Sequence, residues 1–106
     1  MKLLTLNVHA WLEDNQAEKI DIIADTIVEK GYDIVALQEV NQLMSAPAIS
    51  QALKQDNYGV VLLNKINQRA TQKYSLFWSN SHIGYDKYDE GIALLFLPYQ
   101  LAELRG

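Results

Sequence analysis

The 106-residue chain has no cysteine, no long apolar run and no excess of basic residues. Without cysteine it can form neither a disulfide framework nor a thiolate metal site, which fits a reducing compartment. No apolar segment approaches the ~18 residues of a membrane-spanning helix. Met1 leads directly into a strand-like run with no signal-peptide pattern. We therefore expect a cytoplasmic protein with no membrane partner.

The acidic balance of the chain limits the kind of ligand that it can bind. Nine Lys and Arg residues oppose thirteen Asp and Glu residues, which gives a net charge of -4 at pH 7. A broad basic face for nucleic acid needs the opposite balance, so we expect a small ligand and no stable nucleic-acid complex. The local exception is residues 57–85, which contain no acid but include Lys65, Arg69 and Lys73. A solvated loop is the favoured interpretation of its polar centre, and a phosphate-attracting loop is the alternative.

The first forty residues have the pattern of a strand, a helix and a second strand. Residues 3–7 are strand-like, and "DIVAL" at 33–37 is a short apolar run typical of a buried strand. Between them, residues 17–30 carry apolar side chains at the spacing of one helical face: Ile20, Ile23, Ala24 and Ile27. Asn15 fits the start of a capping box, and Gly31 fits the left-handed residue after a helix.

Two strands joined in this way normally lie parallel, so their carboxyl ends meet at one edge of the sheet. Asn7 ends the first strand, and Gln38 and Glu39 follow the second. Because ligand sites gather at such ends, we expect Asn7 and Glu39 to face each other there. Their oxygens suit Mg²⁺ or Mn²⁺ rather than zinc, and Mg²⁺ completes its shell with water and substrate phosphate. Ordinary helix caps or surface groups are the alternative.

The later part of the chain predicts one short helix and three strands. "SAPAISQALKQ" at residues 45–55 is typical of a helix with proline in its first turn. "YGVVLLN" at 58–64 and "KYSLFWS" at 73–79 predict an antiparallel strand pair joined by the polar loop. "GIALLFL" at 91–97 predicts another strand, which Pro98 stops. No repeat or internal domain boundary is predicted.

The phrases "TLNVHAW" and "DIVALQEV", with the helix between them, resemble the start of the endonuclease/exonuclease/phosphatase superfamily. Its members include exonuclease III, deoxyribonuclease I, neutral sphingomyelinases and inositol-polyphosphate phosphatases. The resemblance implies that Asn7 is the metal-shell asparagine, which also contacts the substrate. It implies that Glu39 is the metal-binding glutamate and that the cofactor is Mg²⁺, with Mn²⁺ as a substitute.

The resemblance resumes at "YDEGIALLF", residues 88–96. In several branches the glutamate of this phrase orients a catalytic histidine or arranges the phosphate site, and Glu90 matches it. Tyr88 or Tyr85 corresponds to a substrate-contacting tyrosine that some branches place near here; a solvated hairpin is the alternative for both.

His9 and the end of the last strand complete the comparison with the superfamily. His9 stands two residues beyond Asn7 and is a candidate for a phosphate contact or a catalytic role, with a packed or capping histidine as the alternative. Many members continue from the last strand with Ser-Arg, whereas this chain has Phe96 and Leu97. The branch that uses that arginine is therefore not supported.

The fold that the resemblance implies is α/β (α+β), a four-layered α/β/β/α sandwich about twice as long as this chain. Residues 1–106 would be the N-terminal half of that single domain, with one mixed sheet and flanking helices. The superfamily's catalytic histidine and its Asp-x-Asn and Ser-Asp-His phrases, which belong to the C-terminal half, are absent from this sequence. We expect the chain alone to be inactive and to self-associate through its uncovered sheet.

The function that the resemblance implies is Mg²⁺-dependent hydrolysis of a phosphoester by the full-length protein. The acidic balance and the look of the opening phrase favour a small phosphorylated metabolite, in particular a sugar phosphate. A nuclease of the same superfamily and a non-catalytic α/β binding module are the alternatives.

Overall fold

The computed structural model describes residues 1–10, 14–49, 53–84 and 88–98, and the side chains among them outside residues 80–88. The elements follow the order β1 (Leu3–Asn7), α1 (Gln16–Lys30), β2 (Ile34–Leu43), α2 (Tyr58–Arg69), β3 (Ser75–Gly84) and β4 (Tyr88–Phe96). No helix of these residues has the length and apolar character needed to cross a membrane.

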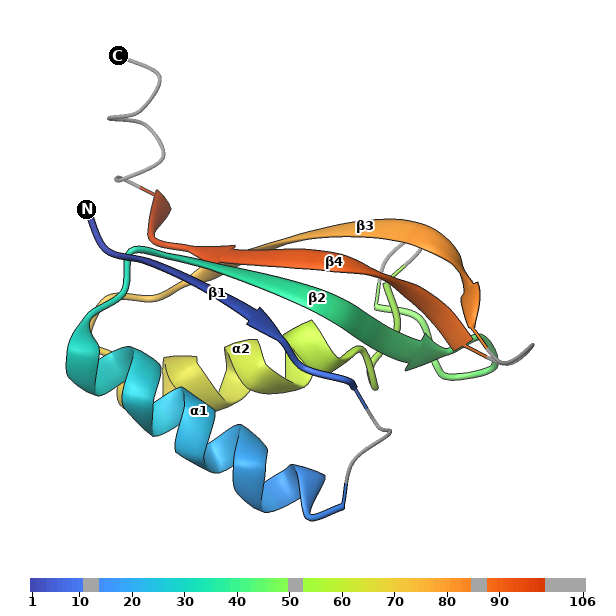
Figure 1. The fold of residues 1–106 in the computed structure, drawn as a ribbon, viewed down its shortest axis with the longest axis horizontal. Coiled ribbons are helices and arrows are strands. Elements are labelled where there is room, and N and C mark those ends of the chain that lie inside the picture. Colours follow the sequence, from blue (N-terminus) through green and yellow to red (C-terminus); the bar gives the residue numbers. More distant parts are fainter. Residues whose placement is uncertain (11–13, 50–52, 85–87, 99–106) are drawn as a thin grey trace.

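The four strands form one mixed sheet in the order β1-β2-β4-β3 (Figure 1). β1 and β2 are parallel, whereas β2 pairs with β4 and β4 with β3 in antiparallel fashion. The predicted α/β class with one mixed sheet is therefore confirmed, and so is the parallel arrangement of the first two strands. This arrangement brings the ends of β1 and β2 to the same edge of the sheet.

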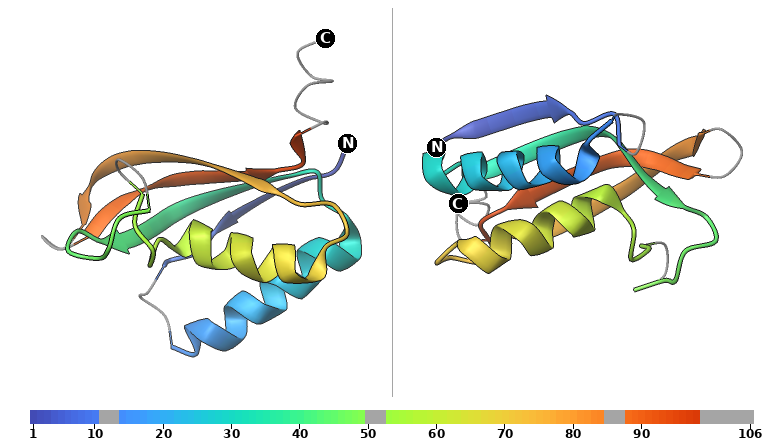
Figure 2. Two further views of the ribbon diagram at one scale, coloured as in Figure 1. Left: turned by 180° about the vertical axis from the view of Figure 1, so that it is seen from behind. Right: turned by 90° about the horizontal axis from the view of Figure 1, so that it is seen from below.

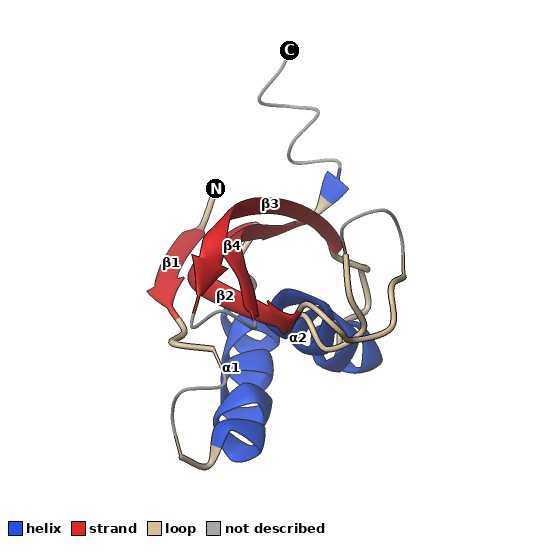
Figure 3. Cartoon of the chain, turned by 90° about the vertical axis from the view of Figure 1, so that its right-hand side faces the viewer, coloured by secondary structure: helices blue, strands red, loops and turns tan. Residues whose placement is uncertain are grey.

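Both helices cover the same face of the sheet, as the views from behind and from the side show (Figures 2 and 3). The core between the helices and the sheet includes fully buried residues from both helices and from two strands: Ile20, Ala24, Ile27, Val35, Leu37, Leu62, Ile66, Ala93 and Leu95. We call the opposite surface of the sheet its open face. Leu3, Phe77 and Ile92 are exposed on it.

Helix α1 has the predicted position, but it begins in an unexpected way. Asn15 precedes the helix with a φ of 57° and makes no capping hydrogen bond through its side chain. The predicted capping box is therefore wrong, because a left-handed backbone turns this side chain away from the first-turn amides. Gly31 ends the helix with a φ of 67°, as predicted, and its amide donates to the carbonyl of Ile27 at 3.0 Å.

Helix α2 replaces the strand predicted at residues 58–64 and the first part of the polar loop predicted after it. The side-chain oxygen of Asn57 accepts a hydrogen bond from the amide of Gly59 at 2.8 Å and so caps the helix. Tyr58, Leu62 and Ile66 recur every fourth residue and are fully buried. The helical spacing of these buried residues, which continues into the polar stretch, therefore decides the structure of this segment, although its first residues favour a strand by composition.

The helix predicted around Pro47 is also wrong in the residues that the structure describes. Ala48 and Lys54 form an isolated antiparallel bridge. The amide of Ile49 donates to the carbonyl of Leu53 at 2.7 Å, and the amide of Gln55 to that of Pro47 at 2.8 Å. These backbone groups are used across a loop and are no longer available for a helical turn. Residues 50–52 lie outside the described residues.

The strands predicted at residues 73–79 and 91–97 are present as parts of β3 and β4. They pair with each other. The predicted pairing of residues 73–79 with 58–64 is wrong, because the latter segment is helical and lies under the sheet. β4 ends at Phe96, ahead of Pro98.

Candidate functional site

The side chains of Asn7, His9 and Glu39 lie together at the edge of the sheet where β1 ends. Asn7, the last residue of β1, pairs in register with Gln38 of β2. The side-chain amide of Asn7 donates a hydrogen bond to Oε2 of Glu39. The expected juxtaposition of Asn7 and Glu39 is therefore present in the fold.

A bulge in β2 sends the Glu39 side chain toward β1. The register of β2 with β4 shifts between Leu37 and Val40, and Glu39 has a φ of 54°. His9, on the other side of the site, has a φ of 45°. The left-handed region costs a residue with a side chain about 1–2 kcal/mol, and such strain concentrates at functional sites. His9 and Glu39 both have a strained backbone and face each other, which makes this edge of the sheet a candidate functional site.

His9 completes the cluster. Its backbone amide donates to Oδ1 of Asn7 at 3.1 Å, and its ring atom Nδ1 lies 3.4 Å from Oε1 of Glu39. The side chains of His9 and Glu39 are 50% and 37% exposed, respectively, so a ligand can reach both from solvent. One oxygen of the Glu39 carboxylate thus faces the amide of Asn7 and the other faces the imidazole.

The donor set fits a hard divalent cation held mainly by Glu39. A partly exposed carboxylate beside an amide is a ligand type that Mg²⁺ takes, with water and substrate oxygens filling the remaining positions. Among the described residues, no three His, Asp or Glu side chains cluster as a closed protein cage would require. In this arrangement Asn7 turns its nitrogen to Glu39 and its oxygen to His9, so it orients the carboxylate. A 180° rotation of the Asn7 side-chain amide would place its oxygen, in place of its nitrogen, beside the Glu39 carboxylate, where the oxygen could bind a cation.

The other candidate residues lie on β4 or beyond the described residues. Glu90 pairs with Asn41 of β2, two positions along β2 from Glu39. Strand alternation places Glu90 on the same face as Ile92 and therefore on the open face. Tyr88 is the first residue of β4 and pairs with Leu43 and Gly84.

Tyr85, the other tyrosine candidate, lies outside the described residues. The structure thus joins Asn7, His9 and Glu39 by direct contacts and places Glu90 on the neighbouring strand.

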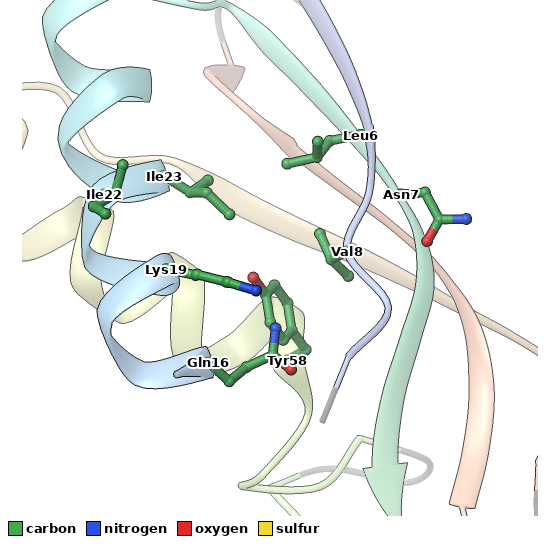
Figure 4. A pocket seen from close by; sticks show the side chains of 8 residues that line it. All are labelled: Leu6, Asn7, Val8, Gln16, Lys19, Ile22, Ile23 and Tyr58. Carbon is green, nitrogen blue, oxygen red and sulfur yellow. The ribbon is translucent and has the colours of Figure 1, made fainter. Parts of the chain in front are cut away.

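A cavity of about 280 Å³ lies between β1 and α1, next to this cluster but on the other side of β1. Leu6 and Val8 point into it, and Lys19 reaches it from α1 (Figure 4). Asn7 lines its edge, yet the Asn7 side chain points away from it, toward the open face (Figure 4). The cavity is therefore separate from the Asn7, His9 and Glu39 cluster.

The basic residues of the stretch 57–85 are occupied within the fold. Arg69 lies 3.0 Å from Asp21 and 2.7 Å from Asp25, and Lys65 lies 3.4 Å from Asp21. Lys73 donates to backbone carbonyls at the end of α2. Loss of hydration acts to raise the pKa of Asp21, but Lys65 and Arg69 together outweigh it and hold that pKa below its usual value. Lys65 and Arg69 thus join α2 to α1, and Lys73 binds the end of α2, so these interactions favour a structural role over a phosphate-attracting loop.

Comparison with known proteins finds a similar solved structure. No protein-family model and no curated protein sequence matches the chain. Among solved structures, the chain is similar to an endonuclease/exonuclease/phosphatase family protein from Leptotrichia buccalis C-1013-b, with 55% identity and a TM-score of 0.88 over 91% of this chain. Most of this chain is therefore similar to part of an endonuclease/exonuclease/phosphatase family protein. It spans 36% of the length of that relative.

In this chain, the sequence did not predict the two buried amide side chains of β2. Asn41 and Gln42 are 1% and 0% exposed although both are polar. Gln42 accepts hydrogen bonds from the Lys54 amide at 2.8 Å and the Asn57 side chain at 3.0 Å. Two consecutive amide side chains between the apolar residues Val40 and Leu43 are the signal that could have revealed them, because buried amides need partners.

Proposed function

We propose that the protein to which this chain belongs is a Mg²⁺-dependent phosphoesterase that hydrolyses a small phosphorylated metabolite, in particular a sugar phosphate. The observation that carries the proposal is the contact of Asn7 and His9 with the two oxygens of the Glu39 carboxylate. The backbone of Glu39 is held in the left-handed region. The similarity to an endonuclease/exonuclease/phosphatase family protein supports it.

In this proposal each residue of the cluster has one task. Glu39 holds the cation, which when bound neutralises charge on the phosphate and the leaving oxygen. Asn7 keeps the carboxylate in place through its amide and contacts the substrate. His9 is half exposed beside the carboxylate, where its ring can donate a hydrogen bond to a phosphate oxygen.

Glu90 and Tyr88 lie on β4, outside the cluster of Asn7, His9 and Glu39, and have supporting roles in this proposal. Glu90 lies on the adjacent strand, where a carboxylate can orient a general base supplied from outside this chain. Tyr88, at the start of the same strand, is the candidate for a further substrate contact.

The preference for a small substrate rests on charge. The net charge is -4, and Arg69 and Lys65 of α2 are paired with acids of α1. A duplex backbone needs a track of available cations, and these residues do not supply one. A nuclease is the alternative function within the family, and a preference for DNA substrates is the observation that would favour it.

The test is hydrolysis of a panel of sugar phosphates and DNA substrates by the full-length protein in Mg²⁺. We expect Glu39→Gln to lower kcat/KM about 100-fold or more, because a metal contributes several kcal/mol to the transition state and each ~1.4 kcal/mol is tenfold. Glu29→Gln makes the same chemical change on the exposed surface of α1 and should leave kcat/KM unchanged. Equal activity of the Glu39→Gln and unaltered proteins would refute the proposed role of Glu39.

A further inference from the structure

Asn41 is a polar side chain buried at the base of the site. It follows the bulge of β2, two residues after Glu39, and is 1% exposed. Its side-chain nitrogen donates to the carbonyl of Ala10 at 3.0 Å. Ala10 is itself fully buried and lies directly after His9. Asn41 therefore connects the strand that carries Glu39 to the turn that carries His9.

This turn is held by two further hydrogen bonds from the bulge. The amide of Val8 donates to the carbonyl of Gln38 at 3.1 Å, and the amide of Ala10 donates to the carbonyl of Glu39 at 3.0 Å. Ala10 is thus bound on its amide by Glu39 and on its carbonyl by Asn41. His9 lies between the two buried anchors Val8 and Ala10 with its side chain half exposed.

Asn41 uses only one side of its amide group among the described residues. Its oxygen Oδ1 is buried and has no hydrogen-bond partner among them. A buried polar atom without a partner costs about 1–3 kcal/mol; an apolar side chain would avoid that cost but would leave the buried Ala10 carbonyl without this donor. The amide group contributes one contact in return, the bond to Ala10. That contact opposes the strain of the left-handed His9 backbone.

We propose that Asn41 is a positioning residue that locks the turn of residues 8–10 against the β2 bulge and so fixes His9 and Asn7 relative to the Glu39 carboxylate. This inference rests on the proposed function in one respect: the arrangement that Asn41 fixes is the cation site. Asn41 itself touches neither cation nor substrate. It acts by limiting the freedom of the residues that do.

The test compares two buried asparagines, Asn41→Ala and Asn57→Ala. Asn57 is 0% exposed and makes two side-chain hydrogen bonds at the start of α2, so its loss destabilises the fold away from the site. We expect Asn41→Ala to accelerate hydrogen exchange of the Ala10 amide about tenfold beyond any general increase and to weaken Mn²⁺ binding about 10–100-fold, as loss of outer-shell partners does. Asn57→Ala should do neither selectively.

Either of two results would contradict the positioning role of Asn41. In the unaltered chain, an Ala10 amide that exchanges as fast as an unstructured peptide overturns it, even if Asn41→Ala does not fold. A folded Asn41→Ala or Asn41→Leu protein with unchanged Ala10 exchange and Mn²⁺ affinity also overturns it. If the full-length protein binds no Mn²⁺, the proposed function fails, and selective exchange at Ala10 still supports the positioning role of Asn41.

Discussion

The two faces of the sheet differ in what their side chains do. On the helix-covered face, Val35, Leu37 and Leu95 are fully buried. On the open face, Leu3 and Phe77 remain 63% and 55% exposed. Burial stabilises the first face, at roughly 25 cal/mol per Å² of apolar surface, whereas an exposed apolar face is typical of a surface that contacts further protein. The polar cluster lies at the edge of this second face, where the alternation of β2 is broken.

The packed core therefore lies on the covered face, and the candidate site lies at the edge of the open face. The regular part of β2, from Ile34 to Leu37, keeps strict pairing with β1 and β4. Its bulged part turns Glu39 toward Asn7 and loses that regularity. Substitutions on the covered face should therefore change the free energy of unfolding, and substitutions in the cluster should change binding.

The largest expected effect on stability contrasts Leu37→Ala with Phe77→Ala. Leu37 is fully buried, so its truncation should cost about 2–5 kcal/mol. Phe77 is 55% exposed on the open face, and its truncation should cost less than about 1 kcal/mol. Urea unfolding of the purified chain measures both. Equal losses at a concentration where the chain is monomeric would contradict the difference between the two faces, because Phe77 would then be packed within the chain itself.

A smaller loss is expected for Gly59→Val, at the point where α2 approaches β4. A Cβ at Gly59 would lie 3.1 Å from the Cβ of Ala93 and 3.1 Å from Oδ1 of Asn57. Valine should push α2 away from the sheet and disturb its cap, at a cost of about 1–3 kcal/mol. Asn64→Val, at an exposed position of the same helix, should cost only a few tenths, roughly its helix-propensity difference. Thermal unfolding of the two variants separates close packing from propensity.

The smallest effect concerns the charges between the helices. The pKa of Asp21 is lowered in the folded chain, so its contribution is present above the usual value of 3.8 and is lost as the pH falls through the lowered pKa. Asp21→Asn should therefore lower the Tm slightly at about pH 7 and not at about pH 2. Thermal unfolding at both pH values measures this. A Tm difference of the same size at both would indicate that the Asp21 charge is not its cause.

The first half of the fold could be predicted from the sequence because its patterns are unambiguous. The apolar spacing of residues 17–30 predicts a helix, and two strands joined by short links through such a helix normally lie parallel. The meeting of Asn7 and Glu39 follows from that topology. The bulge at Glu39 does not, because it depends on how β2 pairs with the distant strand β4.

Helix α2 shows where local patterns mislead. "YGVVLLN" contains the β-branched and aromatic residues that strands favour, so this short window by itself predicts a strand. Ile66, inside the polar stretch, continues the four-residue spacing of Tyr58 and Leu62, so the helical signal was present over a longer window. Contacts such as the bond from Asn41 to Ala10 could not be predicted, since they join residues 31 apart in sequence.

The most direct test of the account is the place where Mn²⁺ binds. In a nuclear magnetic resonance titration, the paramagnetic ion broadens the amide signals nearest to it. The account predicts strongest broadening at Asn7, His9 and Glu39, and its loss in Glu39→Gln. Strongest broadening at Asp21 and Asp25 of α1, or equal broadening of the Glu39→Gln chain, would contradict the claim that this edge of the sheet is a cation site.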